Sequence, residues 1–174
     1  GMGWLDQQDL QDWLHLLINE YPEANITLYG VSMGASAVLN LAGSDLPKQV
    51  DTVIADSGFT SVAEIFETQL NDTLHLPSFP IMNAANSVSK LRINLDFYQA
   101  STVALVPNIK IPIFYIHGEL DNFVPVSNVH ALAKATSSPH HVWVVENANH
   151  GEAVKVEPDV YRKRLHEFIQ NERD

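Results

Sequence analysis

The sequence contains no cysteine, few basic residues and no long apolar run, and each of these absences excludes some classes of function. Without cysteine there is no disulfide framework, no thiol nucleophile and no thiolate metal site. Ten Lys and Arg stand against 21 Asp and Glu, so the net charge of −11 opposes binding to nucleic acid and to anionic lipid surfaces. No apolar run is long enough to span a bilayer, so we expect no membrane segment in this chain.

The first residues show no targeting segment. Residues 4–9 carry neither a basic start nor an apolar stretch, so no signal peptide is expected there. Together with the lack of cysteine, this favours a cytoplasmic protein, while an anchor encoded upstream of Met2 stays an open alternative. Gly1 before Met2 resembles a remnant of tag removal. At 174 residues and 45% hydrophobic composition, we expect residues 1–174 to form a single globular domain.

The most informative stretch is residues 25–39, which reads as a short buried strand, a sharp turn and the start of a helix. Its centre is a G-x-S-x-G pattern around Ser32. A strand that reverses at once into a helix holds a serine hydroxyl clear of its neighbours, as attack on a carbonyl requires. We expect glycine at positions 30 and 34 because a side chain there would collide with the adjoining strand or helix. The alternative is an ordinary helix that Ser32 caps.

Strands and helices alternate along the rest of the chain. The pattern predicts strands at residues 25–30, 50–56, 111–118 and 141–146, and helices at residues 4–20, 34–42, 62–75, 125–135 and 158–171. This order predicts an α/β fold with three α/β/α layers, a mostly parallel sheet and right-handed crossovers. Residues 76–107 contain three prolines, and we expect an irregular, cap-like excursion with a helix around 81–91.

Three reactive side chains follow three of the expected strands: Ser32, Asp121 and His150. In a parallel sheet these strand ends share one edge, where functional residues collect. Serine needs a base to take its proton, imidazole suits that task near neutral pH, and a carboxylate orients the ring. Asp56, at the end of the second strand, and Glu119 are alternative acids, and His150 could instead be a surface histidine.

Other motifs add little chemistry. The pair His140 and His141 could bind a metal ion but has no third ligand nearby, and neither H-E-x-x-H nor a nucleotide-binding glycine motif occurs, so we expect no metal and no cofactor. Two aromatic residues, Phe59 and Phe123, are placed to line an apolar substrate pocket. We expect His117 to support the loop that carries the acid.

Three segments carry a family resemblance. Gly-Val-Ser-Met-Gly-Ala-Ser, Ile-His-Gly-Glu-Leu-Asp-Asn-Phe-Val-Pro and Asn-Ala-Asn-His-Gly-Glu resemble the nucleophile, acid and histidine segments of the α/β-hydrolase superfamily, especially its prolyl-oligopeptidase-like and esterase-like members. The resemblance implies Ser32 as nucleophile, Asp121 as acid, His150 as base and the Met33 N–H as an oxyanion donor. It implies hydrolysis of a small-molecule ester, thioester or amide through an acyl-enzyme, without a cofactor.

The resemblance covers the last four of the eight strands of that fold. The absent half would contain the loop that supplies the second oxyanion N–H, and losing one such donor costs about 10²–10³ in turnover. The alternative function is therefore a weak or inactive hydrolase that serves as a binding or assembly module. The strand before Ser32 would lie at a sheet edge, where unpaired backbone groups invite pairing, so we expect a homodimer through this edge or the first helix.

Overall fold

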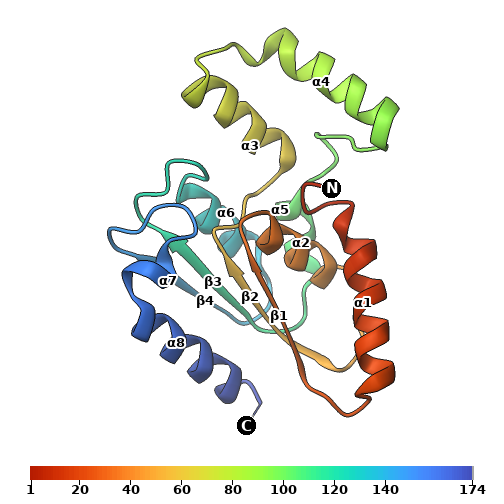
Figure 1. Ribbon diagram of the computed structural model, residues 1–174, viewed down its shortest axis with the longest axis vertical. Coiled ribbons are helices and arrows are strands. Elements are labelled where there is room, and N and C mark those ends of the chain that lie inside the picture. Colours follow the sequence, from red (N-terminus) through yellow and green to blue (C-terminus); the bar gives the residue numbers. More distant parts are fainter. Residues whose placement is uncertain (174) are drawn as a thin grey trace.

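The computed structural model describes residues 1–173, which contain one sheet of four parallel strands with helices on both faces (Figure 1). In chain order the elements are α1 (Asp6–Glu20), β1 (Ile26–Val31), α2 (Met33–Ala42), β2 (Val50–Asp56), α3 (Val62–Thr68), the π-helix η1 (Gln69–Thr73), α4 (Ser78–Ile93), α5 (Thr102–Leu105), the 3-10 helix η2 (Val106–Asn108), β3 (Ile113–Gly118), α6 (Ser127–Ala135), β4 (His140–Val145), α7 (Ala153–Val156) and α8 (Pro158–Asn171). The four predicted strands and the parallel three-layer fold are confirmed.

The sheet order is the chain order, β1-β2-β3-β4, and this decides which face each helix covers. Right-handed crossovers that always step in one direction place their helices on one face. The first core cluster accordingly joins α2, η2 and α6 to this face. No strand follows β4 in the described residues, and α8 packs on the opposite face.

The two central strands are buried on both faces. Val53 of β2 and Tyr115 of β3 point into the first cluster, while their neighbours along the strands, Ile54 and Phe114, point into the second, which includes Phe168 of α8. Successive side chains of a strand point to opposite faces of the sheet, so a strand covered on both faces is buried along its whole length. Full burial of each such side chain contributes roughly 1.5–3 kcal/mol. The sheet is thus a rigid base for the loops at its upper edge.

A helical arm (residues 62–93: α3, η1 and α4) rises above the edge where the strands end (Figure 1). A third cluster, which includes Phe59, Ile65, Phe97 and Val124, joins the base of the arm to the loop after β3. Along α4 the burial is slight, since Met82 is the one fully buried residue of that helix. The arm therefore depends on its base for its position.

The region expected to be irregular is more helical than predicted. α4 spans 16 residues, and the prolines at 77 and 80 precede its regular part, because the backbone is non-helical at Phe79 and helical beyond it. Proline is tolerated at a helix start, where its missing N–H costs nothing, so these prolines do not interrupt the helix. The helix predicted for residues 62–75 is α-helical to Thr68 and then widens into η1.

β1 is an edge strand, as expected. The N–H groups of Ile26 and Ser32 donate to carbonyls of Gln49 and Asp56 on the β2 side, at 2.7 and 2.8 Å. Because backbone groups alternate along a strand, those of residues 27, 29 and 31 face the open edge. No strand pairs with this edge within residues 1–173.

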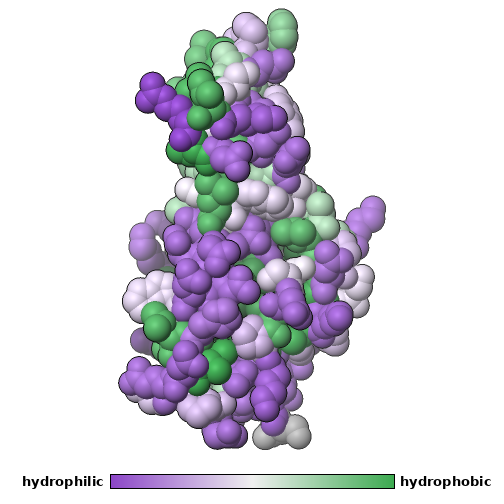
Figure 2. All heavy atoms as spheres, turned by 90° about the vertical axis from the view of Figure 1, so that its right-hand side faces the viewer, coloured by the Kyte–Doolittle hydropathy of each residue, from purple (hydrophilic) through white to green (hydrophobic). Residues whose placement is uncertain are grey.

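The side of the molecule that carries α1 is shown in Figure 2, where hydrophobic side chains gather in separate groups among hydrophilic ones. Trp13, Leu16 and Leu17 of α1 are exposed, and so are Tyr29 and Val31 of β1. None of the helices in residues 1–173 has the length and apolar character needed to cross a bilayer.

Candidate active site

Ser32 stands at the turn between β1 and α2 in a strained backbone conformation, with φ 56° and ψ −119°. Such values are uncommon for residues other than glycine and persist where the surroundings fix them. A Cβ at Gly30 would overlap the Gly34 carbonyl, so the turn closes only over glycine at that position. At Gly34 a Cβ would meet nothing within 4 Å, so the predicted collision there is wrong.

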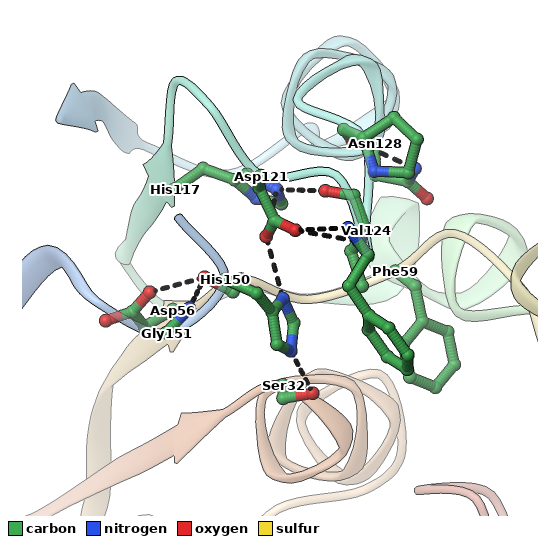
Figure 3. A network of polar contacts seen from close by, with 12 residues as sticks. Ser32, Asp56, Phe59, His117, Asp121, Val124, Asn128, His150 and Gly151 are labelled. Carbon is green, nitrogen blue, oxygen red and sulfur yellow. Dashed lines mark hydrogen bonds and ion pairs between the residues drawn. The ribbon is translucent and has the colours of Figure 1, made fainter. Parts of the chain in front are cut away.

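Ser32, His150 and Asp121 form one hydrogen-bonded series (Figure 3). His150 Nε2 lies 2.7 Å from Ser32 Oγ, and His150 Nδ1 lies 2.7 Å from Asp121 Oδ2. A carboxylate can only accept, so Nδ1 carries the proton in this bond and Nε2 is left to accept from the serine hydroxyl. Ser32 and His150 are 118 positions apart in the sequence, and the fold brings them together with Asp121 at the edge where the strands end.

Asp121 is held as an ionised acceptor. Its side chain is fully buried, and Oδ1 accepts the N–H groups of Phe123 at 3.0 Å and Val124 at 2.8 Å. Burial alone would raise its pKa, but the hydrogen bonds from His117, His150 and the Val124 N–H outweigh burial and hold that pKa well below its usual range. Asp121 is therefore a carboxylate throughout the neutral range.

His117 contacts this loop, as expected. The ring is completely buried, and its Nε2 lies 2.8 Å from the Val124 carbonyl and 3.3 Å from Asp121 Oδ2. Both neighbours are acceptors, so Nε2 carries the proton. Nδ1 is buried without a hydrogen-bond partner.

The two alternative acids do not face the imidazole of His150. Asp56 is buried at the end of β2 and accepts hydrogen bonds from Tyr161 and Ser57. Burial raises the pKa of Asp56 despite these two bonds. Glu119 is exposed and accepts the N–H of Asn147.

The two aromatic residues predicted to line a pocket lie in different surroundings. Phe123 is 45% exposed, and its ring centroid is 5.0 Å from that of His150. Phe59 is only 3% exposed and packs in the third cluster, with its backbone bonded to Ser36. A substrate can touch the Phe123 ring in the structure as it stands, and the role of Phe59 stays a prediction.

Met33 begins α2, and its N–H belongs to the first turn, where backbone donors have no partner within the helix. It directly follows Ser32, the position expected for an oxyanion donor. His140 Nδ1 contacts the Ser138 carbonyl instead of forming a ligand set with its neighbour. Nowhere in residues 1–173 do three His, Asp or Glu side chains come together as a metal site would require.

One group of polar residues beside the site escaped prediction. Ser57 and Tyr161 bond the buried Asp56, and Ser57 also accepts the N–H of Gly151, next to His150. Nothing in the sequence pattern indicates that Tyr161, on a helix 105 positions away, turns its hydroxyl toward Asp56. The polar Asp-Ser pair at a strand end was the one available signal.

The chain matches known proteins over nearly its whole length. The uncharacterized protein YqkD of Bacillus subtilis is 30% identical over 173 residues, which cover 99% of this chain and 57% of YqkD. An esterase from Pyrococcus furiosus superposes with a TM-score of 0.73 at 22% identity, over 97% of this chain and 62% of the esterase. An acylaminoacyl peptidase from Pyrococcus horikoshii gives 0.68 at 17% identity, over 95% of this chain and 27% of the peptidase.

These structural likenesses confirm the predicted α/β-hydrolase fold. The chain spans about 57% of the length of YqkD and 62% of the esterase. Residues 2–172 match the prolyl oligopeptidase family, almost the entire sequence. The chain therefore belongs to the prolyl oligopeptidase family.

Proposed function

We propose that the chain is a serine hydrolase that cleaves an ester, thioester or amide of a small acyl substrate. The observation that carries this proposal is the unbroken series Ser32, His150 and Asp121, joined by two contacts of 2.7 Å. Family membership supports hydrolysis in general, and the two contacts support this particular set of residues.

The contacts suggest a role for each group. His150 Nε2 takes the proton of Ser32 as Oγ attacks the carbonyl carbon, and the buried carboxylate of Asp121 stabilises the resulting imidazolium. The Met33 N–H donates to the oxyanion. The imidazolium then returns the proton to the leaving group, and a water molecule, activated by the same ring, releases the acid from Ser32.

Substrate choice is left to the rim of the site. Phe123 offers an exposed ring beside His150, which suits an apolar acyl or leaving group. Solved structures with the same fold include an esterase and an acylaminoacyl peptidase, so both ester and amide substrates belong in a first screen.

Labelling with a fluorophosphonate tests the proposal. In buffers between about pH 6 and 9, wild-type protein should gain one phosphonyl group by mass spectrometry, on Ser32. Ser32→Ala should not be labelled. Ser44→Ala is the matched control, because Ser44 lies at the other end of α2 and bonds only the Leu41 carbonyl; it should be labelled like wild type.

The alternative is a catalytically weak or inactive hydrolase that serves as a binding or assembly module. We identify one oxyanion donor, the Met33 N–H, and the loss of one donor from such a site costs about 10²–10³ in turnover. If folded wild-type protein is not labelled at any pH in this range, the alternative replaces the proposal. Labelling of Ser32→Ala at the wild-type rate would assign the nucleophile elsewhere.

A further inference from the structure

A polar chain ties the loop that carries His150 to the centre of the sheet. The Gly151 N–H donates to Ser57 Oγ at 3.2 Å, and Ser57 Oγ donates to Asp56 Oδ1 at 2.9 Å. Figure 3 shows the two ends of this polar chain, Asp56 and Gly151, beside His150, each with a dashed line that marks its hydrogen bond. Asp56 belongs to β2, which pairs with a strand on each side, so the polar chain ends on a strand held by two neighbours.

A second branch reaches the same carboxylate from α8. Tyr161 OH donates to Asp56 Oδ2 at 2.8 Å, and Tyr29 OH of β1 lies 3.0 Å from Tyr161 OH. Burial, together with its neighbours Tyr29 and Asp56, raises the pKa of Tyr161, so the phenol stays protonated and able to donate. Each oxygen of Asp56 thus receives one hydroxyl proton, from Ser57 and from Tyr161.

The direction of these bonds depends on a carboxylate at position 56. A carboxylate accepts without donating, so both hydroxyl protons turn toward it, and each hydroxyl oxygen then has its lone pairs free for the next donor. For Ser57 that donor is the Gly151 N–H, and for Tyr161 it is the Tyr29 hydroxyl. An amide at position 56 would offer a donor to one hydroxyl and leave that hydroxyl proton without its acceptor.

We propose that Asp56, through Ser57, is a positioning residue for His150: it fixes the Gly151 N–H and thereby the backbone that sets His150 Nε2 against Ser32 Oγ. The inference rests on the proposed function of Ser32 and His150. Asp56 touches neither residue, so it takes no part in proton transfer. Without this hydrogen bond, the flexible backbone at Gly151 would allow the loop to turn the His150 ring away from the Ser32 hydroxyl.

Two variants interrupt the polar chain at different hydrogen bonds. Ser57→Ala removes the acceptor of the Gly151 N–H, and Asp56→Asn disturbs the orientation of Ser57 while preserving shape. A misplacement of about 1 Å at a reacting group costs up to about 100-fold in rate, so we expect the fluorophosphonate labelling rate of both variants to fall about 10- to 100-fold. The inhibitor concentration at half-saturation and the final labelled fraction should not change, because the substrate surface and the nucleophile are intact.

The matched pair for the second branch is Tyr161→Phe and Tyr115→Phe. Each removes one buried phenol hydroxyl, but Tyr115 bonds Thr136 at 2.7 Å on the opposite face of the sheet. Tyr161→Phe should slow labelling, and Tyr115→Phe should label at the wild-type rate even if it loses as much stability.

Hydrogen exchange at the Gly151 amide, read by NMR, tests the inference independently of activity. Exchange should be faster in Ser57→Ala and Asp56→Asn than in wild type and Tyr115→Phe. If wild type is not labelled but exchange follows this order, the proposed function fails, while the restraint of Gly151 by Ser57 and Asp56 is supported. Wild-type labelling rates in Ser57→Ala and Asp56→Asn, with Gly151 still protected, would overturn the positioning role.

Discussion

The three side chains of the candidate site are held with different firmness. Asp121 is fully buried and bonded from three sides by its own loop and two histidines, whereas the His150 side chain keeps 23% of its exposure. Ser32 is fixed by the strained turn that presents it, with no side-chain hydrogen bond besides the one to His150. The acid is thus the most preorganised member of the series.

Replacing the acid should abolish most of the activity without unfolding the protein. In Asp121→Asn the amide can still accept the two loop N–H groups, but it no longer favours the proton on His150 Nδ1, so we expect the acylation rate to fall by about 10⁴. Stopped-flow labelling gives the rate, and circular dichroism checks the fold. Asp56→Asn should be far less harmful; if it is the more damaging of the two, Asp56 is the acid.

The lowered pKa of Asp121 also predicts how stability depends on pH. A carboxyl whose pKa is lower in the folded state stabilises the fold above its unfolded value of 3.8, and this contribution is lost as the pH falls through that value toward the folded pKa. The difference in unfolding free energy between wild type and Asp121→Asn should be largest above about pH 5 and shrink toward pH 3. Asp56, whose pKa is raised, has the opposite pH dependence but is present in both proteins and cancels.

Urea denaturation of both proteins at several pH values measures this difference. The groups that face Asp121 are His117 and His150, and both remain in the variant. A difference that stays constant from pH 7 to pH 3 would mean that Asp121 has no unusual affinity for its proton.

At the scale of the element, the turn between β1 and α2 separates two glycines that look equivalent in the sequence. Gly30 faces the Gly34 carbonyl at close range, whereas Gly34 faces open space at the start of α2. The motif alone could not distinguish them, because the collision depends on how tightly the helix folds back over the strand.

The two glycines should therefore respond differently to alanine. Gly30→Ala forces the turn open and should lower the unfolding free energy by about 1–3 kcal/mol or more. Gly34→Ala meets no atom and removes a flexible residue from a helix, so it should be neutral or stabilising by up to about 1 kcal/mol. Denaturant unfolding compares the two, and an equal loss in both would contradict this steric account.

Other elements show what sequence patterns could and could not predict. The strand predicted at residues 111–118 corresponds to β3, because its continuous apolar run leaves few alternatives to a buried strand. The ends of this strand and of the one predicted at residues 141–146 then placed Asp121 and His150 at the same edge of the sheet. The arm was harder to predict, because its prolines suggested breaks, whereas they lie at the start of α4 and its regular part follows them. The hydrogen bonds of Asp56 to Ser57 and Tyr161 were not predicted, because the bond to Tyr161 depends on the side-chain packing of α8.

At the scale of the whole molecule, the open edge of β1 is a surface that a partner could cover, and we propose that this partner is a second copy of the chain. Backbone groups of residues 27, 29 and 31 face outward, and exposed apolar side chains lie on β1 and α1. Antiparallel pairing of two β1 strands would satisfy the backbone groups and extend the sheet.

Sedimentation velocity on edge variants tests this association. Thr27→Pro removes an outward N–H from β1 together with the side-chain hydroxyl that bonds Thr52 of β2, and it should give monomers. Thr27→Val loses the same hydroxyl but keeps the N–H, so it should dimerise like wild type. If Trp13→Ala separates the copies and Thr27→Pro does not, α1 forms the contact. A wild-type monomer at the highest attainable concentration rules out both surfaces.

The position of Ser32 at the end of an edge strand has one further consequence. The nucleophile belongs to the strand that is held from one side, while its base and acid come from loops beyond the two strands farthest from it. Fraying of β1 alone would pull the hydroxyl away and leave the histidine and carboxylate paired, because local openings begin where fewest neighbours restrain the backbone. The rate of reaction would then depend on the fraction of time that β1 stays paired with β2. A partner that binds the free side of β1 would act as an activator without contacting the substrate.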